Sequence, residues 1–244
     1  MKKTLKLFLL CLTCCSICFL LIIQLTRKTA SSAVENRQKS VSDTAVSLLK
    51  QYQPLKNATV ILDPGHGGND PGMVLEDLYE KDVNLQLCEK IRNFLTDWGC
   101  TVLTTRDDDT YVSLEDRVQM TKDHKADLFI SIHLNALDHD TTLSGIETYY
   151  NTSSSSDSKL LAEAVQAALI NETGANDRAA RGDSNLYVVR MPRIPSCLVE
   201  AGYLTSDTER PLLLSDDYQE KLAEGIAKGI LQFTSLKKTP EQKT

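Results

Sequence analysis

The sequence lacks the features that mark several common classes of protein. It has no long basic run after Lys28, and its formal net charge is -6, which argues against a nucleic-acid groove lined by a basic stripe. The glycine-rich segment at residues 65–72 lacks the Gly-Lys-Ser/Thr ending of a nucleotide phosphate loop. We therefore expect no nucleic-acid partner and no phosphate-binding loop.

Cysteines are few in the body of the chain. Of 7 cysteines, four lie between residues 11 and 18, in a hydrophobic run where they act as small apolar side chains. The other three, Cys88, Cys100 and Cys197, are scattered, and no two of them have the Cys-x-x-Cys spacing of a metal knuckle. The cysteines therefore predict neither a disulfide framework nor a metal site.

The N-terminal segment is hydrophobic. Residues 7–25 carry no charge and are followed by Arg27 and Lys28, and the run is long enough to cross a bilayer as a helix. We expect residues 1–28 to form a membrane anchor that holds the rest of the chain outside the cytoplasm. Cleavage near residues 31–33, followed by secretion, is the alternative. We expect a polar tether at residues 29–55 (with a short helix near 42–52), one folded domain at 56–236 and a disordered tail at 237–244.

Short apolar strands alternate with amphipathic helices through the folded domain. This order predicts a single α/β domain with a central mostly parallel or mixed sheet flanked by helices. Ligands bind at the carboxyl ends of the strands in such sheets. The expected strands are residues 59–62, 101–105, 128–132, 145–150, 186–189 and 197–199, and the expected helices are residues 83–98, 114–122, 160–170 and 217–233.

Metal-ligand residue types stand close to the ends of three expected strands. His66 lies in the glycine-rich turn after the first strand, His133 follows the strand at 128–132, and Glu200 follows the strand at 197–199. Two imidazoles with a carboxylate suit a zinc ion that keeps an open position for water. Taken singly, His66 also fits a surface turn and His133 fits a core histidine. Glu200 emerges among apolar neighbours, where a charge is costly unless it is paired or used.

Glu80 stands at the start of an expected helix. A carboxylate there is also favoured by capping and by the helix dipole, so a structural role is the alternative to a metal ligand. The charged runs Arg106-Asp107 and Glu115-Asp116-Arg117 are expected to form a loop and a salt-bridged helix face rather than a substrate clamp.

Five segments in order resemble the zinc-dependent N-acetylmuramoyl-L-alanine amidases, which cleave the bond between N-acetylmuramic acid and L-alanine in cell-wall peptidoglycan. The similarity implies one Zn2+ ion held by His66, Glu80 and His133, with Glu200 as the catalytic carboxylate. It also implies a central sheet of about six strands. Two departures are small: Leu134 stands where the family often has alanine, and Thr205-Ser206 stand where Ser-Asn is common. The segments are residues 61–68 (ILDPGHGG), 79–85 (YEKDVNL), 131–136 (SIHLNA), 145–150 (GIETYY) and 198–204 (LVEAGYL).

The resemblance also implies a substrate and a place of action. The substrate is peptidoglycan, a glycan strand with its stem peptides, and the reaction serves wall turnover, cell separation or spore cortex modification. Asn135, Arg181 and Glu147 lie near expected strand ends and are expected either to orient the substrate or to lie on the surface. Residues 151–178 leave room for one helix and for no long inserted regulatory helix, so we expect a site that is not autoinhibited and needs no obligate protein partner.

Two other functions fit parts of the pattern. A zinc exopeptidase or carboxypeptidase that acts on wall peptides would also place histidines and carboxylates at strand ends, although such sites often hold two metals and need more ligands. A non-catalytic peptidoglycan-binding protein is the non-enzymatic alternative. It is disfavoured because His66, Glu80, His133 and Glu200 are all present.

Overall fold

A computed structural model describes residues 39, 44, 45, 48, 55–137, 140–153 and 156–238. The chain divides into two units after Gln51, and the described residues of the second unit, which begins at Tyr52, form a compact domain. The expected anchor at 1–28, nearly all of the tether and residues 239–244 of the tail lie outside the described part. No helix in the described part is long and apolar enough to cross a membrane.

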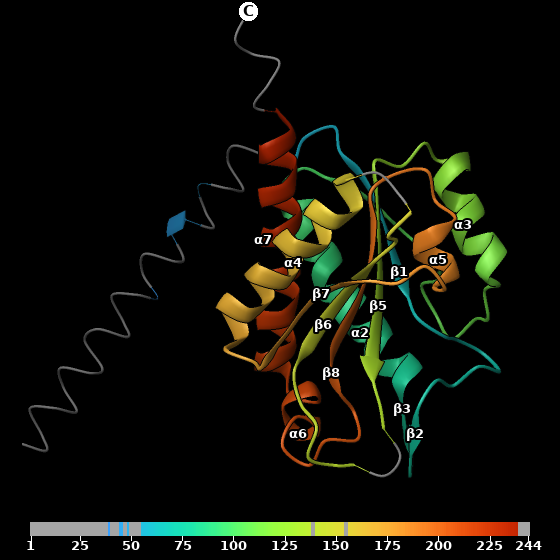
Figure 1. Cartoon of the computed structure of the whole chain (residues 1–244), viewed down its shortest axis with the longest axis vertical. Coiled ribbons are helices and arrows are strands. Elements are labelled where there is room, and N and C mark those ends of the chain that lie inside the picture. Colours follow the sequence, from blue (N-terminus) through green and yellow to red (C-terminus); the bar gives the residue numbers. More distant parts are fainter. Residues whose placement is uncertain are drawn as a thin grey trace, which may run out of the picture. The chain divides into compact units, whose positions relative to one another are not determined.

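The second unit is built around a six-stranded sheet. Its strands are β1 (Thr59–Pro64), β4 (Thr101–Thr104), β5 (Leu128–Asn135), β6 (Ile146–Tyr150), β7 (Asp177–Gly182) and β8 (Ser196–Tyr203). Figure 1 shows β1, β5, β8, β6 and β7 between the helices, and the six strands lie in the order β4-β1-β5-β8-β6-β7. The first four are parallel, whereas β6 is antiparallel to β8 and parallel to β7. A separate two-stranded sheet pairs β2 (Val74–Leu75) with β3 (Leu78–Tyr79).

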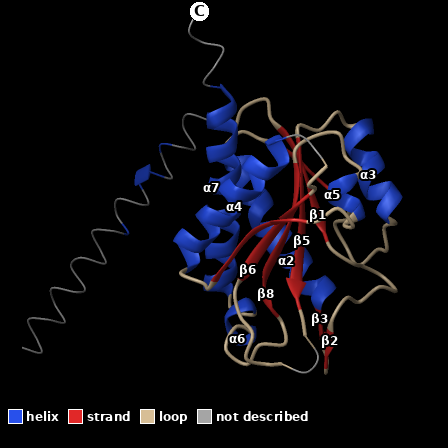
Figure 2. Ribbon diagram, viewed as in Figure 1, coloured by secondary structure: helices blue, strands red, loops and turns tan. Residues whose placement is uncertain are grey.

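Helices cover both faces of the six-stranded sheet (Figure 2). On one face α2 (Glu80–Asp97) and α4 (Ser156–Thr173) pack against the strands, and α7 (Asp216–Lys238) packs against both of these helices. The other face is covered by the shorter α3 (Leu114–Asp123) and α5 (Tyr187–Arg190), and α6 (Arg210–Leu213) precedes α7. This arrangement confirms the expected α/β domain with a mixed sheet between helices.

The face under α3 and α5 changes from apolar to polar along the strands. Ile61, Phe129 and Leu198 are buried there and pack against the helix residues Val188 and Val189. Side chains two residues apart on a strand share a face. Further along the strands the same face therefore carries Asp63 of β1, His133 of β5 and Glu200 of β8, toward the carboxyl ends of these parallel strands.

Two expectations for the sheet are wrong. Residues 186–189 were expected to form a strand, but Tyr187–Arg190 form the helix α5. Adjacent residues on a strand point to opposite faces, whereas Val188 and Val189 are both buried in the same cluster, which a helical turn permits. The strand β7 was not expected: three of its six residues are charged and none is a large apolar residue, which suits an edge strand.

Candidate metal centre

The turn after β1 places His66 next to His133. His66 has a left-handed backbone, with φ 62°, and the turn continues through Gly67 and Gly68, which also have positive φ. Gly65 allows the close approach of the two segments, because a Cβ atom at this position would lie 2.3 Å from Cε1 of His133. The glycine-rich loop thus brings the end of β1 against the end of β5.

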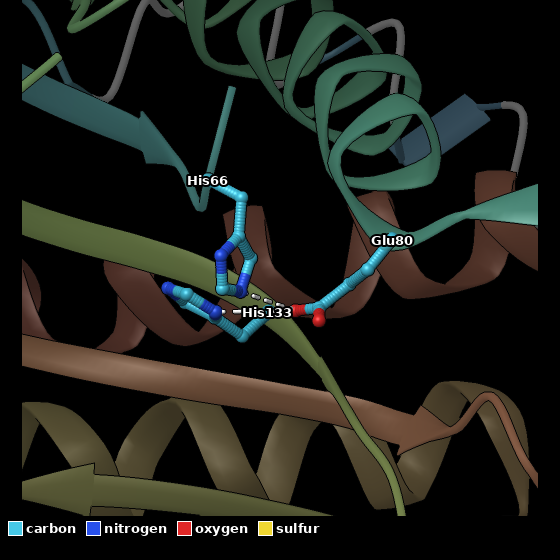
Figure 3. A group of neighbouring side chains, drawn as sticks. All are labelled: His66, Glu80 and His133. Carbon is cyan, nitrogen blue, oxygen red and sulfur yellow. Dashed lines mark hydrogen bonds and ion pairs between the residues drawn. The ribbon is translucent and has the colours of Figure 1, made fainter. Parts of the chain in front are cut away.

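The structure brings His66, Glu80 and His133 together from three separate elements (Figure 3). Oε1 of Glu80 lies 3.2 Å from Nε2 of His66 and 3.2 Å from Nδ1 of His133. The two imidazole rings meet edge to face, with centroids 4.8 Å apart. Ligand atoms of a tetrahedral zinc site lie about 3.3 Å apart, given zinc–ligand bonds of about 2.0–2.1 Å. The three side chains therefore have a donor set that suits one zinc ion; the two distances to Glu80 match this spacing, and all three ligand atoms lie within 4.8 Å of one another.

Glu80 is the first residue of α2 and is 4 % exposed. Its Oε1 also accepts a hydrogen bond from the backbone N–H of Leu134, 3.1 Å away, and its Oε2 accepts one from the N–H of Met73, 3.0 Å away. Burial alone would raise the pKa of this carboxyl, but hydrogen bonds and charges from His133 and His66 hold it well below its ordinary value. Glu80 is thus a fixed carboxylate aimed at two imidazoles, and it is not a helix cap.

Asp70, which was not predicted as a site residue, completes the environment of His66. Its Oδ2 lies 2.9 Å from Nδ1 of His66, the ring nitrogen that faces away from Glu80. Burial lowers the pKa of His66, yet Glu80 and Asp70 together raise it to about 9. A carboxylate on the far nitrogen of a metal-binding histidine fixes the tautomer and the ring orientation. The spacing His66 to Asp70 within one glycine-rich turn was the available sequence signal.

Two buried arginines hold the loop: as expected, Arg106 lies in a loop and Arg117 on a salt-bridged helix, and both side chains are buried. Arg106 is 5 % exposed and donates to the carbonyl oxygens of Gly65 and Lys81, at 2.9 and 2.8 Å. Arg117 is 4 % exposed and donates to the carboxylate of Asp63, at 2.6 Å, and to the carbonyl oxygen of His66, at 2.7 Å. These two charged segments therefore supply buried side chains that hold the loop carrying His66.

Glu200 lies beside the three-residue cluster. It faces His133 in the register of β5 and β8, and its Oε2 is buried without a hydrogen-bond partner among the described residues. Burial raises the pKa of Glu200 to about 7, and the carboxylates of Glu80 and Glu147 add to this shift while His133 opposes it. A carboxyl group with a pKa near neutrality can both accept and donate a proton.

A cleft of about 230 Å³ opens beside His66 and His133. It is bounded by the end of β1, the segment before α3, and α5, so the half-covered face of the sheet gives access to the cluster. The lining residues are Asp63, His66, Asp70, Tyr111, Val112, Leu114, Arg117, His133 and Val188.

The two expected substrate contacts, Asn135 and Arg181, do not line this cleft. Asn135 accepts a hydrogen bond from the N–H of Ala136, and Arg181 lies on β7 near Glu147.

Comparison with known proteins points to one family. Residues 60–232 match the family model described as N-acetylmuramoyl-L-alanine amidase. The germination-specific N-acetylmuramoyl-L-alanine amidase of Bacillus subtilis (strain 168) is 33 % identical over 203 residues, which cover 78 % of this chain and 85 % of that protein.

Solved structures agree. An N-acetylmuramoyl-L-alanine amidase from Clostridium difficile 630 has 40 % sequence identity and a TM-score of 0.70, covering 73 % of this chain and 97 % of its own. The CwlD amidase from Clostridioides difficile, solved in complex with the GerS lipoprotein, has 33 % identity and a TM-score of 0.70, covering 74 % of this chain and all of its own.

Proposed function

Because the chain belongs to the N-acetylmuramoyl-L-alanine amidase family, we propose that it hydrolyses the bond between N-acetylmuramic acid and L-alanine in peptidoglycan with one zinc ion held by His66, Glu80 and His133. The amidase activity is that of the family. The zinc dependence and the residue roles are our proposals. The observation that supports them most directly is the cluster of two imidazoles and one carboxylate beside the buried, unpartnered Oε2 of Glu200.

The donor set favours zinc. Imidazole nitrogens with a single carboxylate suit zinc, and three protein ligands are the number found in catalytic zinc sites. Zinc bound in this way acts as a Lewis acid that polarises a carbonyl group and makes water more acidic. The carboxylate of Asp70, which contacts His66, and the N–H groups that bind Glu80 would keep the three ligands in place.

Glu200 supplies the proton transfers in this proposal. Its carboxylate takes a proton from the attacking water, and the same carboxyl then gives a proton to the nitrogen of the leaving L-alanine. This role is supported by Oε2 of Glu200, which forms no hydrogen bond with any described residue and is therefore available to accept one from the water. The described cysteines are buried, so none is placed as a nucleophile.

The substrate route and the absence of autoinhibition are further parts of the proposal. The segment between β6 and β7 holds α4, which packs with α7 on the sheet face opposite His133 and Glu200. The cleft beside His66 therefore stays accessible without a partner protein. Since CwlD was solved with a lipoprotein, an assay of the chain alone decides whether a partner is needed. Asn135, close to His133 at the end of β5, remains a proposed substrate contact.

The place and the occasion of the reaction are also proposals. The uncharged run at residues 7–25, flanked by basic residues, supports an extracytoplasmic enzyme anchored in the membrane. The similarity to a germination-specific amidase favours spore cortex modification over wall turnover and cell separation. Cell fractionation with an antibody to the folded domain tests the first proposal: release into the medium as a shortened chain would instead support cleavage and secretion.

The main experiment uses the full-length protein, purified in a non-ionic detergent, with purified peptidoglycan. We expect free stem peptides that begin with an L-alanine amine, detected by mass spectrometry, and their loss after chelation and return with Zn2+. Glu200→Gln should retain bound zinc and lose turnover, whereas His133→Ala should lose the metal. Cuts between amino acids of the stem would instead support a carboxypeptidase. Zinc-loaded protein that yields no new ends would refute activity without a partner.

A further inference from the structure

A bulge in β7 brings two arginines to the same carboxylate. Ile146 pairs with Asp177 but Thr148 pairs with Ala180, so two residues of β7, Arg178 and Ala179, stand opposite Glu147 alone. On a regular strand, side chains three residues apart point to opposite faces, and one extra residue restores them to the same face. Accordingly Nε of Arg178 is hydrogen-bonded to Glu147, and Nε of Arg181 lies 3.6 Å from its Oε2.

The bulge is held in place by the surrounding structure. Ala179 has φ 71°, in the left-handed region that side chains with a Cβ atom seldom adopt. Oδ1 of Asp177 accepts hydrogen bonds from the N–H of Ala179, at 2.9 Å, and from Nε2 of Gln166 on α4, at 2.7 Å. A strained residue that several contacts maintain is typical of functional regions.

The cluster around Glu147 has more positive than negative charge. The Glu147 side chain is 3 % exposed and its carboxylate accepts hydrogen bonds from the hydroxyls of Tyr149, at 2.7 Å, and Tyr203, at 3.0 Å, as well as from Arg178. Arg178 is also held over the ring of Tyr203, 5.2 Å from its centroid. One carboxylate faces two guanidinium groups, so one positive charge is left over, and Arg181 is the member that reaches solvent.

Arg181 is free to bind an anion. Its side chain is 53 % exposed, and its Nε donates to the carbonyl oxygen of Arg178 at 3.0 Å. That bond and the ion pair with Glu147 both use Nε, and no contact among the described residues uses its terminal amino groups. These groups form the face with which a guanidinium binds a carboxylate through two parallel hydrogen bonds.

Arg181 lies two strands away from Glu200, on the same side of the sheet. Glu147 stands opposite Glu200, and Glu200 stands opposite His133, so one row of side chains crosses β5, β8, β6 and β7. Adjacent strands are about 4.8 Å apart, which places β7 about 10 Å from β8. The long side chain of Arg181 spans part of this distance back toward Glu200, as its contact with Glu147 on the intervening strand shows.

The substrate carries an anion at the matching distance. In a peptidoglycan stem the residue after L-alanine is a D-glutamate linked through its side-chain carboxyl, so its α-carboxylate is free. One residue advances the chain by about 3.8 Å, which leaves this carboxylate one residue beyond the scissile nitrogen and within reach of an arginine on the neighbouring strand. Some bacterial walls carry the amide at this position instead, and an amide cannot accept the paired charge-assisted hydrogen bonds.

We propose that Arg181, positioned by Glu147 and Arg178, binds the free α-carboxylate of the second stem residue and makes the enzyme prefer the acid over its amide. This inference rests on the proposed function, because it takes Glu200 to mark the scissile bond. Arg181 is the specificity-determining residue, and Arg178 and Glu147 are positioning residues that hold its guanidinium in the row.

The test compares two ligands that differ in one group, N-acetylmuramoyl-L-alanyl-D-isoglutamate and the corresponding D-isoglutamine amide. Binding to zinc-loaded full-length Glu200→Gln is measured by titration calorimetry, and kcat and KM of the wild-type protein are measured on both. We expect the acid to bind about tenfold more tightly and to have a correspondingly lower KM. Arg181→Gln should weaken the binding of the acid only, so that the dissociation constants of the two ligands come within about twofold of each other.

A matched control removes an arginine charge elsewhere. Arg92 is half-buried and paired with Asp107 near β4, at the opposite edge of the sheet, so Arg92→Gln should keep the preference for the acid. Equal affinity of the Glu200→Gln protein for acid and amide would overturn the proposal. So would an Arg181→Gln substitution that weakens the binding of both ligands equally. Failure of the wild-type protein to cleave either ligand would count against the amidase proposal, while the binding measurement would still decide the role of Arg181.

Discussion

Replacing Arg117 by methionine should destabilise the domain and loosen the loop that carries His66. The guanidinium of Arg117 is buried with the carboxylate of Asp63, whose side chain is 1 % exposed, and their atoms lie 2.6 Å apart. It also donates to the carbonyl oxygens of Pro64, at 2.8 Å, and His66, at 2.7 Å. Methionine fills a similar volume but leaves a buried negative charge and three carbonyl oxygens, those of Pro64, His66 and Val112, without this donor.

The magnitude follows from the burial of the pair. Breaking a buried ion pair by removing one partner costs about 3–5 kcal/mol, because the remaining charge loses its compensation. Asp63 keeps its hydrogen bonds from Thr105, at 2.6 Å, and Ser131, at 2.7 Å, which places our expectation at the lower end of that range. A loss of about 3 kcal/mol lowers Tm by about 10 °C for a domain of this size.

The assay is urea unfolding of the metal-free protein at neutral pH, followed by a zinc competition titration. Arg92→Met is the control, because its partner Asp107 is exposed and such pairs contribute at most about 1 kcal/mol. We also expect Arg117→Met to bind zinc more weakly, and the double variant Asp63→Asn/Arg117→Met to recover part of the lost stability. A loss below about 1 kcal/mol for Arg117→Met would refute the argument that this buried pair supports the loop.

Two further predictions concern the carboxylates around the metal ligands. Asp70→Asn should raise the zinc dissociation constant about 10- to 100-fold, because His66 loses the charge that orients it. The control Asp123→Asn, on the exposed end of α3, should not change this constant. Equal zinc affinities of the two variants would contradict the prediction. Burial raises the pKa of Glu200 from 4.5 to about 7, so ionisation of this group costs the metal-free wild type stability. The cost is absent below pH 4.5, grows between pH 4.5 and 7, and is complete above pH 7. Glu200→Gln should therefore be more stable than wild type by up to about 3 kcal/mol above pH 7 and equal to it near pH 4, and a pH-independent difference in unfolding free energy would show that Glu200 is not the titrating group.

Most of the elements around the site could be predicted because their sequence patterns are strong. The apolar run at 128–132 became β5, and the helix expected at 217–233 lies within α7. The α5 segment was misassigned because Val188 and Val189 have high β propensity, and tertiary packing overrides that local preference. The strand β7 was missed because its charged residues suit an exposed edge and carry no hydrophobic alternation.

Some residues of the candidate site could also be predicted from the sequence, and some of its contacts could not. His66, Glu80, His133 and Glu200 could be chosen because few residue types bind metals or move protons, and because the ends of parallel strands converge. The loop at Arg106 and the salt-bridged helix at Arg117 were predicted, but the burial of both side chains was not, since a charged sequence usually indicates exposure. Nothing local in the sequence shows that the carbonyl groups of a glycine-rich loop require the guanidinium of Arg117, more than fifty residues later, as a donor.

The sequence by itself determined the fold class and the chemical groups available at the strand ends, because hydrophobic periodicity and residue type are local properties. The tertiary structure alone decided how those groups act together. The support of His66 by Asp70 and Arg117 depends on the path of the loop. The position of Arg181 depends on a bulge opposite Glu147, since one added residue in a strand reverses the face to which the following side chains point.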